Sequence, residues 1–146
     1  MTSPHAESPN APPTDSRVAS VLCWALILVS LSVSTARLMQ ARPLQSANDR
    51  SRWCTVRALV EQGTYRIDDV RRESGWDTID LVRHEGHFYS TKPPLFPTIV
   101  AGVYWAVRQS IGWTFDTHLA EVTRLILTLI NILPTAAALV VLYGLL

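Results

Sequence analysis

The sequence predicts an all-α membrane protein with about three transmembrane helices and one mixed polar loop. Nineteen uncharged residues separate Arg17 from Arg37, and 22 more run from Leu125 to Leu146. A helix needs about 20 predominantly apolar residues to cross the hydrocarbon core of a bilayer. Most of the charge lies between these two stretches, which excludes an ordinary soluble domain.

Residues 1–16 are expected to form a disordered tail, and residues 17–37 the first transmembrane helix. The tail is rich in proline and has no aromatic residue, so it cannot bury enough apolar surface to become ordered. The alternative for the apolar stretch is a cleaved signal peptide, because residues 34–36 have the small-x-small form of a cleavage site.

The polar loop, residues 38–92, begins with a predicted amphipathic helix over residues 48–62. Trp53, Val56, Leu59 and Val60 follow one another at helical spacing. Asn48 or Asp49 can cap the start of this helix, and Gly63 can end it. We expect the helix to lie along the membrane surface beside the first span.

A short strand over residues 64–68 and a charged segment over residues 68–78 are expected next. Residues 80–84 and 87–90 flank a Glu-Gly turn and predict a β-hairpin. This hairpin leads directly to Lys92 and the following apolar segment.

The second transmembrane helix is predicted over residues 93–114 and the third over residues 120–146. Only 15 uncharged residues lie between Lys92 and Arg108, so the second helix spans only if both side chains reach the interface. The chain stops within apolar sequence, so we expect it to be the N-terminal portion of a longer polytopic protein with further transmembrane helices.

The distribution of basic residues indicates which side of the membrane holds the loop. Ten basic residues lie within residues 37–92, and one, Arg17, precedes the first span. The positive-inside rule therefore places the loop in the cytoplasm, although the rule weakens for loops of this length.

Composition also limits the chemistry. A net charge of +1 and clustered apolar spans give no reason to expect a nucleic-acid partner. Cys23 lies within the first span and Cys54 in the loop, so a disulfide between them is not expected. The segment from His84 to His87 does not have the spacing of a helical zinc motif, and we predict no metal site there.

Three residues are candidates for a functional site. Lys92 is followed by two prolines, which hold the backbone extended and place the ammonium at the membrane surface, where it can meet a lipid phosphate. Asp49 and Arg52 lie three residues apart on one helix face, and could serve as a general base and a phosphate ligand. The structural alternatives are an interfacial anchor for Lys92 and a helix cap with a local ion pair for the other two.

Taken in order, an apolar span, D-x-x-R, G-x-Y and G-H-F-Y-x-x-K-P-P-L resemble the GT-C superfamily of polytopic glycosyltransferases over about residues 17–110. The aminoarabinose transferases of lipid A and the protein O-mannosyltransferases are the nearest relatives by this resemblance. It implies an enzyme that transfers a sugar from a polyprenyl-phosphate donor to an acceptor hydroxyl with inversion. It further implies a bacterial inner-membrane protein with residues 38–92 outside, on the opposite side from the one that the basic residues indicate.

The resemblance also implies roles for individual residues. Asp49 corresponds to the acidic residue that deprotonates the acceptor, while Arg52 and Lys92 correspond to cations that hold the donor phosphate. Aminoarabinose transferases often have glutamate before the lysine, whereas this chain has Thr91, so a divalent metal is possible but not supported. No nucleotide or other cofactor is expected, and membrane lipid and a lipid-linked sugar are the expected partners.

A non-catalytic polytopic membrane protein, whose loop binds a partner or anionic lipid, is the alternative from another class. A frameshifted fragment would also account for the apolar C-terminus. For the 146-residue chain alone, we expect no transferase activity.

Overall fold

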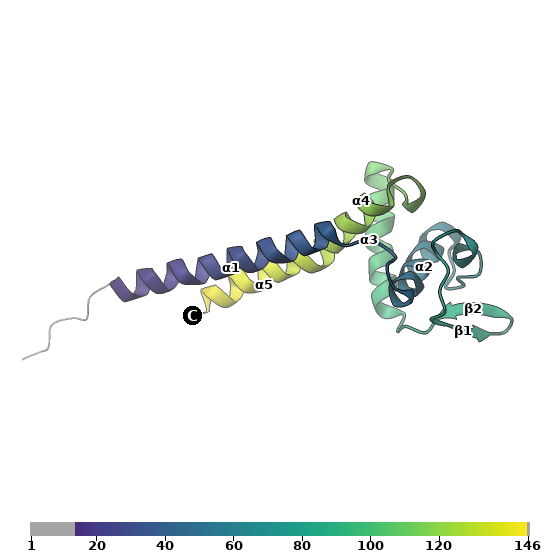
Figure 1. Cartoon of the computed structure of the whole chain (residues 1–146), viewed down its shortest axis with the longest axis horizontal. Coiled ribbons are helices and arrows are strands. Elements are labelled where there is room, and N and C mark those ends of the chain that lie inside the picture. Colours follow the sequence, from purple (N-terminus) through teal and green to yellow (C-terminus); the bar gives the residue numbers. More distant parts are fainter. Residues whose placement is uncertain (1–13, 146) are drawn as a thin grey trace, which may run out of the picture.

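The computed structural model describes residues 14–145 and shows two long helical segments that lie side by side and carry a smaller head region at one end (Figure 1). The head region, residues 46–127, contains the short helices and the hairpin, and its last helix is also the beginning of the second long segment. In chain order the elements are α1 (Thr14–Gln40), α2 (Ala47–Gln62), η1 (Val70–Arg72), β1 (Leu81–His84), β2 (His87–Ser90), α3 (Leu95–Ile111), α4 (Phe115–Leu127), η2 (Thr128–Ile132) and α5 (Leu133–Gly144).

The two long segments are long and apolar enough to cross a membrane. They comprise Arg17–Gln40, with 24 residues, and Phe115–Gly144, with 30 residues that include α4, η2 and α5. Only 6% of each apolar window is buried within the protein, so apolar side chains cover the outside of both helices. Trp24 of α1 packs on Tyr143 of α5, with ring centroids 5.0 Å apart. The first and last predicted spans are therefore confirmed as helices of suitable length and composition.

Pro134 lies where the second long segment changes its hydrogen-bond pattern. The π-helical turn η2 ends immediately before α5, and the Leu133 N–H donates to the Thr128 carbonyl five residues earlier. Proline lacks an N–H, so the usual bond to residue 130 cannot form. The wider π-helical turn accommodates this loss, and the run of helix continues instead of breaking.

The predicted amphipathic helix is α2, the central helix of the head region. Its N-cap is Ser46, so the expectation of Asn48 or Asp49 at that position is wrong. The Ser46 hydroxyl oxygen accepts a hydrogen bond from the Asp49 N–H at 3.1 Å, which satisfies one of the free donors of the first turn. Gly63 ends the helix with a left-handed φ of 68°, as predicted.

The predicted hairpin is confirmed as the antiparallel pair β1 and β2, with His84 opposite His87. Glu85 and Gly86 have φ values of 50° and 85°, the two positive values that a type I′ turn requires. The strand expected over residues 64–68 is absent: this segment is irregular and joins β2 through a single backbone bond, from Ile67 N–H to the Phe88 carbonyl.

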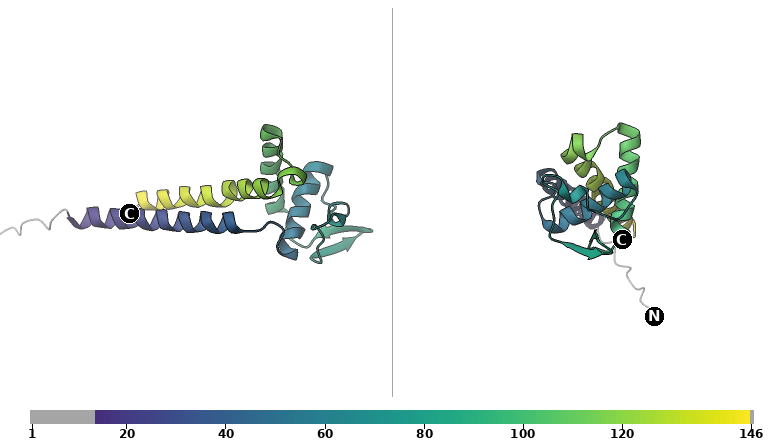
Figure 2. Two further views of the ribbon diagram at one scale, coloured as in Figure 1. Left: turned by 45° about the horizontal axis from the view of Figure 1, so that its top comes forward. Right: turned by 90° about the vertical axis from the view of Figure 1, so that its right-hand side faces the viewer.

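The second predicted transmembrane helix, over residues 93–114, corresponds to α3 but is not confirmed as a span. Its 17 residues extend for about 26 Å, less than the roughly 30 Å of a hydrocarbon core. In the views of Figures 1 and 2, α3 runs across the two long segments and packs on α2. Val100 and Tyr104 face the core, whereas Leu95 and Trp105 are exposed.

The core of the head region lies between α2, α3 and the start of α4. Tyr104 is fully buried and packs on Phe115, which also contacts Trp53 and Trp76. Arg57 of α2 is only 5% exposed and forms ion pairs with carboxylates of three segments. These are Glu61 at 2.8 Å, Glu73 at 2.7 Å and Asp116 at 2.7 Å. One buried guanidinium thus connects α2, the segment after η1 and the start of α4.

Candidate functional site

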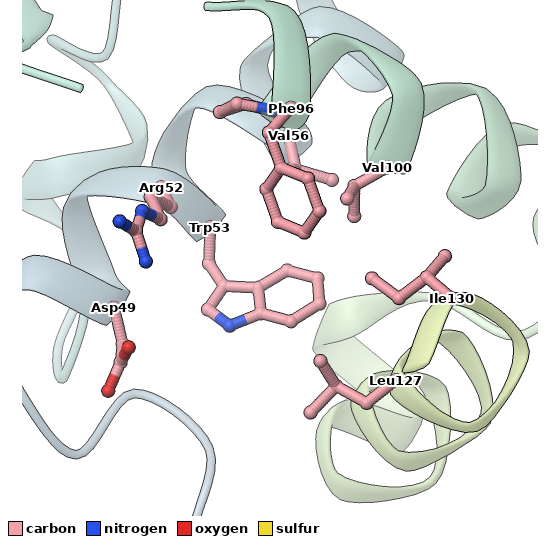
Figure 3. Close-up of a pocket in the computed structure, with 9 residues that line it drawn as sticks. Asp49, Arg52, Trp53, Val56, Phe96, Val100, Leu127 and Ile130 are labelled. Atoms are coloured by element: carbon pink, nitrogen blue, oxygen red, sulfur yellow. The ribbon is translucent and has the colours of Figure 1, made fainter. Parts of the chain in front are cut away.

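Asp49 and Arg52 lie on the first two turns of α2 and line a cavity of about 100 Å³. Both side chains are partly buried. They project from the helix on the same side of Trp53, as the spacing of three residues predicts (Figure 3). The structure therefore brings together two of the three predicted site residues.

The other side of the cavity is apolar. Figure 3 shows the Trp53 indole between the charged pair and the side chains of Leu127 and Ile130. Phe96 and Val100 of α3 complete this apolar side. Leu127 and Ile130 belong to the long segment that could cross a membrane. Charged side chains thus line one side of the cavity, and apolar side chains, two of them from a long apolar segment, line the other.

The carboxylate of Asp49 has a structural role as well. One of its oxygens, Oδ2, accepts a hydrogen bond from the Ser46 hydroxyl at 2.7 Å. Together with the bond from the Asp49 N–H to Ser46, this contact ties the first turn of α2 to its N-cap. Asp49 forms no ion pair with Arg52 among the described residues, so the acidic and basic groups remain separate.

Lys92 lies outside this cavity. Its Nζ pairs with Asp80 Oδ2 at 2.7 Å, and both side chains are partly exposed. It lines a separate cavity of about 410 Å³ with Thr55, Tyr65 and Tyr89. The structure therefore does not place Lys92 in the same cavity as the other two predicted residues.

Asp80 is the ion-pair partner of Lys92, and sequence reasoning did not select it. The hydrogen bond from Lys92 lowers the pKa of Asp80, and a hydrogen bond from the Thr91 hydroxyl lowers it further. The positive charges of Lys92 and Arg52 act in the same direction. No ion pair joins Arg52 to Asp80, whose ion-pair partner is Lys92.

A chain of hydroxyl groups fixes the backbone around Asp80. Ser51 donates to the Asp80 carbonyl at 2.5 Å and lies 2.7 Å from the Ser90 hydroxyl. Ser90 accepts from the Lys92 N–H at 3.1 Å. Since a hydroxyl has one proton, Ser90 donates to Ser51. Ser51 is fully buried on α2, so these bonds attach the end of the hairpin to that helix.

The described residues contain no group of three metal-ligating side chains. His84 and His87 face different partners: His84 lies 3.8 Å from Glu85, and His87 lies 3.2 Å from Asp68.

Comparison of the chain with protein families, with curated proteins and with solved structures finds no match. The assignment of a function therefore depends on the motifs and on the geometry of the cavity.

Proposed function

We propose that this chain supplies part of the catalytic site of an integral membrane glycosyltransferase. The enzyme would move a sugar from a polyprenyl-phosphate donor to an acceptor hydroxyl on the outer side of a bacterial inner membrane. The observation that carries the proposal is the two-sided cavity, with Asp49 and Arg52 on one side and Leu127 and Ile130 on the other. A lipid-linked phosphate has the same division into a charged group and a hydrocarbon chain.

Within this proposal, Arg52 holds the phosphate of the donor. A guanidinium can donate two parallel hydrogen bonds to phosphate oxygens, and it remains charged at all relevant pH values. Negative charge develops on the departing polyprenyl phosphate during transfer, so a fixed cation beside it lowers the barrier. The polyprenyl chain then extends over the apolar side chains toward α5.

Asp49 acts as the general base in the same proposal. A carboxylate within hydrogen-bond reach of an acceptor hydroxyl can take its proton as the hydroxyl attacks the sugar. Because Ser46 donates to Oδ2, the side chain is held in one orientation. The second oxygen, Oδ1, is the one that we assign to the acceptor.

Lys92 contributes a second cation. Its ammonium has three donors and can keep the bond to Asp80 while donating to a phosphate oxygen. Because Lys92 and Arg52 lie at different cavities, we assign direct contact with the donor phosphate first to Arg52, and a supporting role to Lys92.

A non-catalytic membrane protein remains the second candidate, and a specific observation favours it. Both Asp49 and Lys92 already have structural partners, Ser46 and Asp80. In this alternative the charged side chains only stabilise the head region and the apolar cavity has no phosphate ligand.

Binding of two matched lipids separates the candidates. The purified chain in detergent is mixed with a polyprenyl phosphate or with the corresponding uncharged polyprenol, and the retained lipid is counted by native mass spectrometry. The transferase proposal predicts preference for the phosphate, a loss of about tenfold in Arg52→Gln and little change in Asp49→Asn. Equal retention of the two lipids, with no effect of Arg52→Gln, would support the non-catalytic candidate.

A further inference from the structure

A second cavity, of about 200 Å³, lies where the two long segments meet the head region. The end of α1, the connection to α2 and one side of α4 form its walls. Its charged residues are Arg42, Asp49 and Arg124, which give a net charge of +1. Its volume far exceeds the roughly 30 Å³ that a water molecule occupies in liquid water.

Two polar side chains on α4 lack partners at this cavity. Thr123 is 4% exposed, and its Oγ1 has no hydrogen-bond partner among the described residues. The Nε of Arg124 is also buried without a partner in this part of the chain. Arg124 takes part in no ion pair with any described carboxylate, and Arg42 takes part in none either.

The half-buried Arg124, which has no ion pair among the described residues, favours an anionic partner at this position. Arg124 belongs to the segment Phe115–Gly144, which is apolar enough to cross a membrane. A charged side chain within such a segment is costly unless it meets an opposite charge or reaches the interface. A buried N–H without an acceptor adds a further desolvation cost.

The position of the cavity identifies the chemistry of the missing group. It lies at the head-region end of the long segments, where lipid headgroups meet the protein if α1 and α5 cross the bilayer (Figure 1). A phosphate offers acceptors to a guanidinium fork and to the Thr123 hydroxyl at once. Leu38 and Leu127 supply apolar surface for the acyl chains of the same molecule.

We propose that this second cavity binds the phosphate of an anionic membrane phospholipid through Arg124, Arg42 and Thr123. The bound lipid neutralises Arg124 and fixes α4 against the end of α1. Asp49 lines both cavities, so its carboxylate separates this structural phosphate from the proposed donor phosphate at Arg52. The inference does not depend on sugar transfer, since it requires only a membrane that contains anionic lipid.

Native mass spectrometry of the full chain with phosphatidylglycerol or phosphatidylcholine tests this site. We expect the wild type to retain the anionic lipid preferentially, and Arg124→Gln to reduce that retention about tenfold. Arg42 is exposed, so Arg42→Gln should reduce the retention of the anionic lipid without altering the buried Nε of Arg124. Arg83→Gln removes an exposed arginine of the hairpin and should leave retention unchanged.

Two further results bear on the ligand. Millimolar inorganic phosphate should not displace phosphatidylglycerol, because free phosphate lacks the apolar contacts; displacement would overturn the assignment to a lipid. If Arg124→Gln and Arg42→Gln both retain the anionic lipid as Arg83→Gln does, the proposal is wrong, and the counter-ion of Arg124 comes from another protein segment. Polyprenyl phosphate retention, measured in parallel, responds to Arg52→Gln and thus separates this site from the proposed donor site.

Discussion

Replacing Arg57 by alanine removes the central cation of the head region. Arg57 is 5% exposed and forms three charge-assisted hydrogen bonds of 2.7 to 2.8 Å. The loss of one partner of a buried ion pair costs about 3–5 kcal/mol, because the remaining charge stays buried without compensation.

The exposure of the three carboxylates decides where in this range the effect falls. Glu73 and Asp116 have side chains that are 45% and 61% exposed, so water solvates them once the arginine is gone. Glu61 is 19% exposed and keeps the Tyr104 hydroxyl at 2.8 Å. Only one carboxylate is therefore left poorly solvated, and we expect a destabilisation of about 3 kcal/mol.

The thiol of Cys54 provides the assay. Cys54 is fully buried in the head region, so it reacts with a maleimide only when this region opens. In a Cys23→Ser background, the labelling of Cys54 at increasing urea concentration gives the free energy of that opening. Arg72→Ala is the matched control, because the side chain of Arg72 is 75% exposed and pairs only with Asp69; it should change the free energy by less than about 0.5 kcal/mol. Equal effects of Arg57→Ala and Arg72→Ala would refute the reasoning.

Burial raises the pKa of Cys54 to about 12, so Cys54 of the folded Cys23→Ser chain should resist maleimide at neutral pH and react after denaturation. Ile79 is 91% exposed, and Ile79→Cys in the absence of both native cysteines should be labelled on intact cells if the loop faces outside; labelling only after lysis would place it in the cytoplasm. Lys92→Met should raise the pKa of Asp80, measured by carboxyl ¹³C NMR. The lowered pKa stabilises the folded chain at pH values above the ordinary pKa of aspartate, and this stabilisation is lost as the pH falls through the pKa of Asp80 in the folded chain. Since the variant's Asp80 is protonated at a higher pH, acid should detach its hairpin at a higher pH than in the wild type. Gly86 has a φ of 85°, and Gly86→Ala should destabilise the hairpin by about 1 kcal/mol, measured by hydrogen exchange of Phe88.

The long helices and the hairpin could be predicted because their signals are local. Residues 18–36 and 125–146 are continuous uncharged stretches that are mostly apolar, and their length alone indicates helices that can span a bilayer. The Glu-Gly pair between two short polar and aromatic runs indicated a two-residue turn, which the positive φ values confirm. The N-cap of α2 was misplaced by two or three residues, because Ser46, Asn48 and Asp49 are all good caps.

The character of α3 could not be predicted from hydropathy. Apolar residues face α2 on one side and are exposed on the other, so a helix packed in the head region has the composition of a short span. The burial of Arg57 could not be predicted from local sequence either. Its partners Glu73 and Asp116 lie 16 and 59 residues away in sequence, and local spacing does not show such contacts.

The candidate site was predicted in part. Asp49 and Arg52 share a cavity because they share a helix face, which is a local property. Whether Lys92 joins them depends on how the hairpin packs on α2, and the structure pairs it with Asp80 instead. Asp80 carried no signal of its own, since an aspartate before a strand is common in surface loops.

Photo-cross-linking of a polyprenyl phosphate with a photoreactive group near its phosphate tests the proposed site most directly. After irradiation of the chain in detergent, peptide mass spectrometry locates the modified residues. The account predicts cross-links at residues 52–56, 96–100 and 127–130 around the cavity. Arg52→Gln should reduce the yield of these cross-links, and the uncharged polyprenol analogue should not form them. Cross-links confined to the exposed faces of α1 and α5, with equal yield from the polyprenol analogue, would contradict it.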